Sequence, residues 1–135
     1  MLSQKRCVLF VCAPLILAGS TCAQEAGRFA GTWRGEHAGK TYLVMTITAG
    51  TPLKLSIFTA VVRVDESGEI SEVEGPVEHE ETVLELKADG GLLRFKTRQD
   101  DGDVADYEMR LEGDGSALLT LLEPPNVKPF RLRRP

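Results

Sequence analysis

The chain has 135 residues, of which 27% are charged and 42% are hydrophobic, and its acidic excess gives a net charge of −4. This length suits one domain, because two separate cores of half the size would each be hard to stabilise. The acidic excess disfavours both a nucleic-acid partner and electrostatic binding to an anionic membrane, since each of these requires a basic surface.

The first 23 residues are typical of an export signal. Lys5 and Arg6 form a short cationic start, residues 7–18 form an apolar run, and small residues then lead to Ala23. The apolar run is too short to span a bilayer comfortably. We therefore predict a signal peptide at 1–23 and a periplasmic or extracellular mature protein, with a buried N-terminal helix as the alternative.

All three cysteines, Cys7, Cys12 and Cys22, lie in this leader. Its removal would exclude disulfide bonds, thiolate metal sites and cysteine nucleophiles from the mature domain, residues 24–135. A rival interpretation makes Cys22 the lipidated N-terminus of a membrane-anchored lipoprotein. The tripeptide at 17–19 has the Leu-Ala-Gly sequence of lipoprotein leaders, but a serine follows it where the cysteine should stand.

The mature chain alternates polar and apolar residues almost throughout, which is the pattern of strands with one buried face and one wet face. No segment shows a sustained helical period. The clearest predicted strands are 29–36, 40–48, 82–88, 92–98, 106–112 and 130–135. The predicted inward residues are Leu43, Met45, Ile47, Leu84, Leu86, Phe95, Tyr107 and Met109.

Two segments alternate less cleanly. In 53–64 the apolar residues change parity, which indicates either a bulge near Ile57 and Phe58 or burial of both faces. Residues 69–78 contain a Gly-Pro pair at 75–76 and are predicted to form an edge strand or a loop.

Turn signals separate the later strands at regular intervals. Asp-Gly pairs at 89–90, 101–102 and 114–115, and a Pro-Asn pair at 125–126, are spaced by about twelve residues. This spacing indicates an antiparallel meander. Eight or nine strands in an open sheet would leave two exposed edges, whereas closure removes them. We predict an all-β fold, an up-and-down barrel of eight or nine strands, with a β-sandwich as the alternative.

Residues 29–36 have the sequence Phe-Ala-Gly-Thr-Trp-Arg-Gly-Glu. A Gly-x-Trp on the first strand, after an export signal and ahead of a meander, resembles the calycin superfamily of lipocalins, avidins and fatty-acid-binding proteins. The resemblance implies that Trp33 packs across the closed end of the barrel beneath an arginine of the last strand, either Arg131 or Arg133.

The resemblance also implies that the barrel holds a small, mostly apolar molecule. Candidate ligand-binding residues are Trp33, Leu43, Met45, Phe95, Tyr107 and Met109. Avidins line their biotin pocket with several tryptophans, whereas this chain has one, so biotin is not the expected ligand. An eight-stranded barrel is only just wide enough for side chains to fill it. A domain with a filled core is therefore the alternative.

No motif for nucleophilic, phosphate-binding or zinc chemistry is present around His37 or His79. We therefore expect no enzyme activity, no cofactor and no metal. Alternate residues of 78–81 point apart on a strand, and the acidic segment 100–106 lacks the spacing of an EF-hand loop. The acid-rich stretch 65–81 is expected to be either a charged edge that resists aggregation or a docking edge for a basic partner.

The predicted function is that of an exported, non-enzymatic domain that binds a small apolar or lipid-like ligand inside a barrel. The alternative is an accessory or protein-interaction module with a filled core and an acidic edge, whose protein partner the sequence does not identify. Membrane attachment is expected only if Cys22 is lipidated. A cavity of some hundreds of Å³ would favour the first function over the second.

Overall fold

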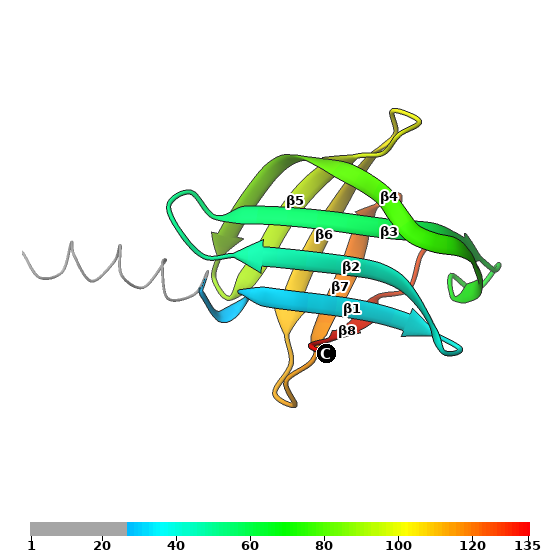
Figure 1. Ribbon diagram of the computed structural model, residues 1–135, viewed down its shortest axis with the longest axis horizontal. Coiled ribbons are helices and arrows are strands. Elements are labelled where there is room, and N and C mark those ends of the chain that lie inside the picture. The colour runs from blue at the N-terminus through cyan, green and yellow to red at the C-terminus, as the bar shows by residue number, and fades with distance from the viewer. Residues whose placement is uncertain (1–26) are drawn as a thin grey trace, which may run out of the picture.

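The computed structural model describes residues 27–135, and the predicted leader with its cysteines lies outside these residues. Eight antiparallel strands, each paired with the next along the chain, form one closed barrel (Figure 1). This confirms the predicted up-and-down barrel. In chain order the strands are β1 (Gly31–His37), β2 (Lys40–Thr48), β3 (Lys54–Val64), β4 (Ile70–Asp89), β5 (Leu92–Arg98), β6 (Val104–Leu111), β7 (Ala117–Glu123) and β8 (Phe130–Arg133).

The last strand closes the barrel. β8 pairs with β7 on one side and with β1 on the other, where Arg34 lies opposite Arg133 and Gly35 lies opposite Leu132. Pairing on both sides gives the two terminal strands the backbone partners that an open sheet would leave exposed.

The core follows the alternation expected from the sequence, since every second residue of β2, β5 and β6 faces inwards. The rings of Phe95 and Tyr107 stack across β5 and β6 with their centroids 4.8 Å apart. Buried side chains from several strands meet in this interior, including Trp33, Met45, Ile47, Ile57, Leu93, Phe95, Met109, Leu119 and Leu132.

β4 is longer than expected. It is one strand of 20 residues, Ile70–Asp89, and it joins the irregular segment 69–78 to the strand predicted at 82–88. Its first half pairs only with β3, because pairing with β5 begins at Thr82. The edge-strand interpretation of this segment is therefore the correct one. In Figure 1, β4 curves over the barrel from one end to the other.

A bulge in β4 overturns one predicted orientation. The register against β5 shifts between Val83 and Glu85, and both Val83 and Leu86 lie opposite buried residues of β5. Side chains on opposite strands share a face, so Val83 and Leu86 face inwards, and the two residues between them, Leu84 and Glu85, turn out. Leu84, predicted to face inwards, is 39% exposed.

The change of parity predicted in β3 is present, but it lies further along the strand. β3 pairs regularly with β2 through Ile57 and Phe58. The register against β4 shifts instead between Thr59 and Val61, and Ile57 and Ala60 are both buried. A bulge therefore lets both halves of this strand face one core, as the sequence indicated. The bulge lies further along the strand than expected.

Trp33 closes one end of the barrel. Its indole is fully buried and donates a hydrogen bond from Nε1 to the carbonyl of Phe29 at 2.9 Å. The guanidinium of Arg134 lies over the ring, 4.2 Å from the centroid, and donates to the carbonyls of Arg28 at 2.8 Å and Ala30 at 3.3 Å. A chain-terminal arginine thus stacks on the tryptophan and ties it to the segment before β1.

The stacking arginine is Arg134, and neither of the two expected residues takes this place. Arg131 donates to the hydroxyl of Ser116 at 2.9 Å, and Arg133 is exposed on the outside of β8. Strand parity explains the difference. Leu132 points into the barrel, so its two neighbours point out, while Arg134 shares the inward parity and reaches across the barrel end.

Candidate functional site

A cavity of about 510 Å³ lies at the end of the barrel away from Trp33. It is partly open to solvent and is bordered by the starts of β2 and β8, the C-terminal half of β3, the middle of β4, the β5–β6 turn, and residues of β6 and β7. This volume falls within the range of roughly 300–1,000 Å³ that is usual for small-molecule sites. The walls are largely apolar, and their side chains include Leu43, Ala60, Val62, Leu121, Val127 and Phe130.

Glu81 is a buried carboxyl group in the wall of this cavity. It lies opposite the buried Ile57 in the pairing of β3 with β4, so its side chain points into the barrel. Glu81 is 5% exposed, and within residues 27–135 it is the only acidic or basic residue in the buried core. A charged group in such a position is costly unless partners satisfy it.

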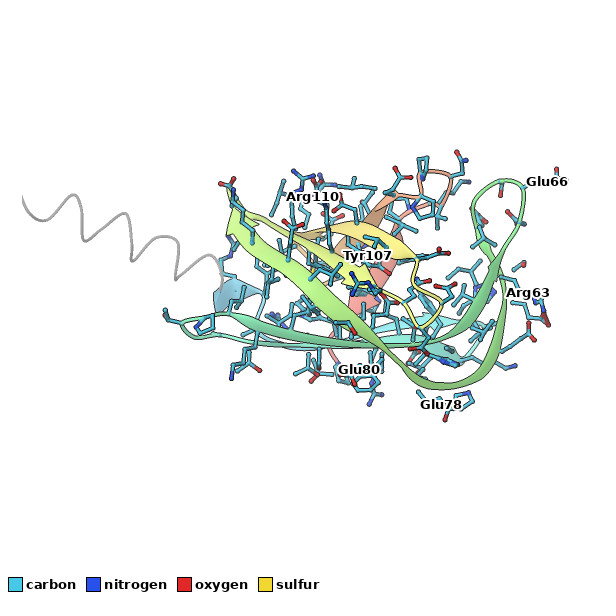
Figure 2. All side chains as sticks on the ribbon, turned by 90° about the horizontal axis from the view of Figure 1, so that it is seen from above. Arg63, Glu66, Glu78, Glu80, Tyr107 and Arg110 are labelled. Atoms are coloured by element: carbon cyan, nitrogen blue, oxygen red, sulfur yellow. The ribbon has the colours of Figure 1, made fainter. Side chains whose placement is uncertain are left out.

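Two hydroxyl groups donate to one oxygen of this carboxyl. The hydroxyl of Thr97 lies 2.5 Å from Oε1 of Glu81, and the hydroxyl of Tyr107 lies 3.2 Å from the same atom. Figure 2 shows Tyr107 in the interior, whereas Glu78 and Glu80 project outwards from β4. Three strands, β4, β5 and β6, therefore position a polar group at the floor of a cavity whose walls are largely apolar.

The cavity rim adds further acidic groups. Asp100 and Asp101, from the β5–β6 turn, line the cavity together with His79. Nδ1 of His79 lies 3.5 Å from Oδ2 of Asp100, and both side chains are largely exposed. Three carboxyl groups and one imidazole thus line the cavity. Within residues 27–135, no lysine or arginine lines it.

Two tyrosines in the lining are held as neutral phenols. Burial raises the pKa of Tyr42 to about 12. Burial, and then the carboxyl group of Glu81, raise the pKa of Tyr107 well above its usual range. The ring of Tyr42 packs edge-on against Phe130 with centroids 5.6 Å apart. It also lies so close to Gly35 that a Cβ there would be 2.7 Å from the ring.

These two tyrosines predict a loss of stability at alkaline pH. In the unfolded chain they ionise near pH 10, whereas in the folded protein Tyr42 keeps its proton to about pH 12 and Tyr107 keeps its proton beyond its usual range. Their stabilising contribution is complete below pH 10 and falls as the pH rises through the folded pKa. For Tyr42 the loss is roughly 2–3 kcal/mol.

Urea unfolding measured at intervals from about pH 9 to about pH 12 tests this expectation. The variant Tyr42→Phe removes one of the two groups, so its free energy of unfolding should fall less steeply than that of the unmodified protein. Equal slopes for the two proteins would contradict the assignment of Tyr42.

The β3–β4 hairpin, which carries the acid-rich stretch 65–81, completes one wall of the cavity. At its tip, the amide of Lys128 donates to the carbonyl of Gly68 at 2.8 Å, so the tip docks on the β7–β8 connection. A Cβ on Gly68 would lie 2.8 Å from the carbonyl oxygen of Asn126, which explains the need for glycine at this contact. Docking places Val64 beside the mouth of the cavity.

A second hollow, of about 580 Å³, lies on the outer surface where β1 meets β8. Four arginines line it, namely Arg34, Arg131, Arg133 and Arg134. Two of them already have structural contacts, since Arg134 covers the barrel end and Arg131 binds a serine hydroxyl. All residues that line this hollow are exposed. It therefore contains no buried group that would orient a ligand, and the barrel cavity is the better candidate site.

The structure separates the predicted ligand-binding residues into two groups. Leu43 and Tyr107 line the cavity. The other four, which do not line it and are at most 1% exposed in the packed core, are Trp33, Met45, Phe95 and Met109.

Sequence reasoning missed Glu81, the buried polar group of the cavity, and Thr97, which donates a hydrogen bond to it. In the sequence, Glu81 is distinguished only as a member of the acidic segments 65–81 and 78–81. The one available signal was the alternation in 92–98, which gives Thr97 the same parity as the apolar Leu93 and Phe95 and so places a hydroxyl inside the barrel.

Comparisons of the chain with protein-family models, with curated proteins and with solved structures find no match. Within residues 27–135, no helix has the length and apolar character needed to cross a membrane. Function is therefore inferred from the geometry and chemistry of the barrel cavity.

Proposed function

We propose that this protein is an exported, non-enzymatic binding protein that holds a small, mostly apolar molecule in its barrel. The observation that carries the proposal is the cavity of about 510 Å³ with largely apolar walls. Such a volume suits a small molecule that buries most of its surface. The core is packed around Trp33, as the filled-core alternative expects, but the space at the opposite end supports binding instead.

The polar groups of the cavity favour binding over catalysis. His79 contacts Asp100, and Thr59 lies opposite His79 in the strand pairing. However, the hydroxyl of Thr59 points to the backbone carbonyl of His79, at 3.5 Å, and not to its imidazole. A nucleophile needs a base within hydrogen-bond reach of its hydroxyl. This arrangement therefore supports a binding site with a polar rim.

A variant that fills the cavity tests the proposed function. Ala60 is 6% exposed and lines the cavity, so in Ala60→Phe the new ring should occupy the space of a ligand. We expect the unmodified protein to bind the neutral dye N-phenyl-1-naphthylamine with enhanced fluorescence, and Ala60→Phe to weaken this binding by about tenfold or more. Val62→Phe provides a second filling variant from the same wall.

The matched control is Val104→Phe, which adds the same ring at a residue that is 46% exposed and outside the cavity. It should bind the dye as the unmodified protein does. Absence of dye binding to the unmodified protein, or equal binding by the filled variants, would overturn the proposal.

Expression of the full chain in an exporting bacterial host also allows an intact-mass measurement, which distinguishes cleavage after Ala23 from lipid attachment at Cys22.

A further inference from the structure

The carboxyl group of Glu81 has an incomplete set of partners. Both hydroxyl donors, Thr97 and Tyr107, reach Oε1. No hydrogen bond from residues 27–135 reaches Oε2, and no lysine or arginine of this part of the chain forms an ion pair with Glu81. A carboxylate has about four acceptor positions. At 5% exposure, Glu81 therefore retains capacity for a donor that only a molecule inside the cavity can supply.

The charges around the cavity have one sign. Glu81 lies at the floor of the cavity, and Asp100 and Asp101 lie at its rim. Within residues 27–135, His79 is the only basic side chain that lines the cavity. Attraction and repulsion between charges are stronger in a partly buried site than in water. The cavity is therefore suited to a cation and unsuited to an anion such as a fatty-acid carboxylate.

The remaining walls are suited to an apolar body joined to that cation. Tyr42 and Phe130 form an aromatic pair on one side, and the ring of Tyr107 lies beside Glu81. Aromatic rings attract cations at their faces and also cover apolar groups. An ammonium group at Glu81 would place an attached alkyl or aryl chain against the apolar wall.

We propose that the barrel cavity selects amphipathic amines, in which a protonated amino group binds Glu81 and an alkyl or aryl chain fills the rest of the cavity. This inference rests on the proposed function of the cavity and specifies its ligand class. The ammonium supplies both the missing hydrogen-bond donor at Oε2 and the missing counter-charge. Pairing of this kind removes the cost of leaving a charge buried without a partner.

Three probes with one chain length test the proposal. Octylamine, octanol and octanoate share an alkyl body and differ in the charge of the head group. Isothermal titration calorimetry near neutral pH should show octylamine binding about tenfold more tightly than octanol, with octanoate weakest. Comparable or tighter binding of octanol or octanoate would overturn the inference while leaving the proposed function intact. If the unmodified protein binds the dye but none of the three probes, the inference fails and the proposed function stands. If it binds neither the probes nor the dye, both proposals fail.

A pair of neighbouring variants isolates the role of Glu81. Glu81→Gln keeps the shape of the side chain and removes its charge, so octylamine affinity should fall about tenfold while octanol affinity changes by less than about threefold. Glu80→Gln makes the same chemical change on the outer face of β4 and should leave both affinities unaltered (Figure 2). Equal effects of the two substitutions would overturn the assignment. The ranking of the three probes on the unmodified protein decides the proposal even if Glu81→Gln does not fold.

Discussion

Deletion of residues 128–135 is expected to abolish cooperative unfolding, because it removes β8 and opens the barrel. This strand holds both closing contacts, with β7 and with β1. Its Leu132 is fully buried, and Arg134 beyond it covers the ring of Trp33. The shortened chain would expose two sheet edges and part of the core at once, and a small domain has little stability to spare.

Urea and thermal unfolding followed by circular dichroism measure this effect. The shortened chain should show a broad, non-cooperative change or no transition, whereas the full chain should unfold in one step. Arg133→Ala is the control within the same strand. Its side chain is exposed, so the free energy of unfolding should change by less than about 0.5 kcal/mol. A shortened chain that unfolds with the original midpoint would show that closure by β8 contributes nothing to the fold.

Closure could be predicted because alternation and turns each leave a clear pattern in the sequence. Residues 92–98 and 106–112 alternate strictly, and an Asp-Gly pair separates them, so a hairpin was the only simple arrangement. The bulge in β4 leaves no comparable pattern, whereas the one in β3 shows as a change of apolar parity. The extra residue at Leu84 is itself apolar, so its outward orientation could not be distinguished from an inward one.

The same bulge concealed the floor of the candidate site. If Leu84 and Leu86 both faced inwards, strict alternation would place Glu81 on the outer surface. The register shift between Val83 and Glu85 reverses this parity and turns Glu81 into the barrel. One inserted residue therefore determines whether this carboxyl is solvated or lies in the cavity.

Alternation also carries no information about position along the barrel axis. Leu43 and Met45 both face inwards from β2, yet only Leu43 lines the cavity, because it lies nearer to the β1–β2 turn. Depth depends on how the strands are staggered against each other, which is a property of the whole closed sheet. For this reason the predicted ligand-binding residues include members of the packed core.

Trp33→Ala is expected to lower the free energy of unfolding by about 3–5 kcal/mol, the usual cost of removing a large buried ring. The indole is fully buried, its Nε1 donates to the carbonyl of Phe29, and Arg134 lies over its face. The substitution removes all three contributions and leaves a cavity at the closed end. Arg134→Ala removes only the stacking contact and two exposed hydrogen bonds, so its cost should be about 1 kcal/mol.

Urea unfolding of both variants distinguishes a structural role for Trp33 from a role in binding. Trp33 does not line the cavity at the other end of the barrel. Trp33→Ala should therefore lose stability while the folded fraction keeps the preference for octylamine over octanol. A loss below about 1 kcal/mol would contradict its role as the anchor of the closed end. A reversed probe preference with stability retained would place Trp33 in the binding site, because only direct contact with the ligand would change selectivity without weakening the fold.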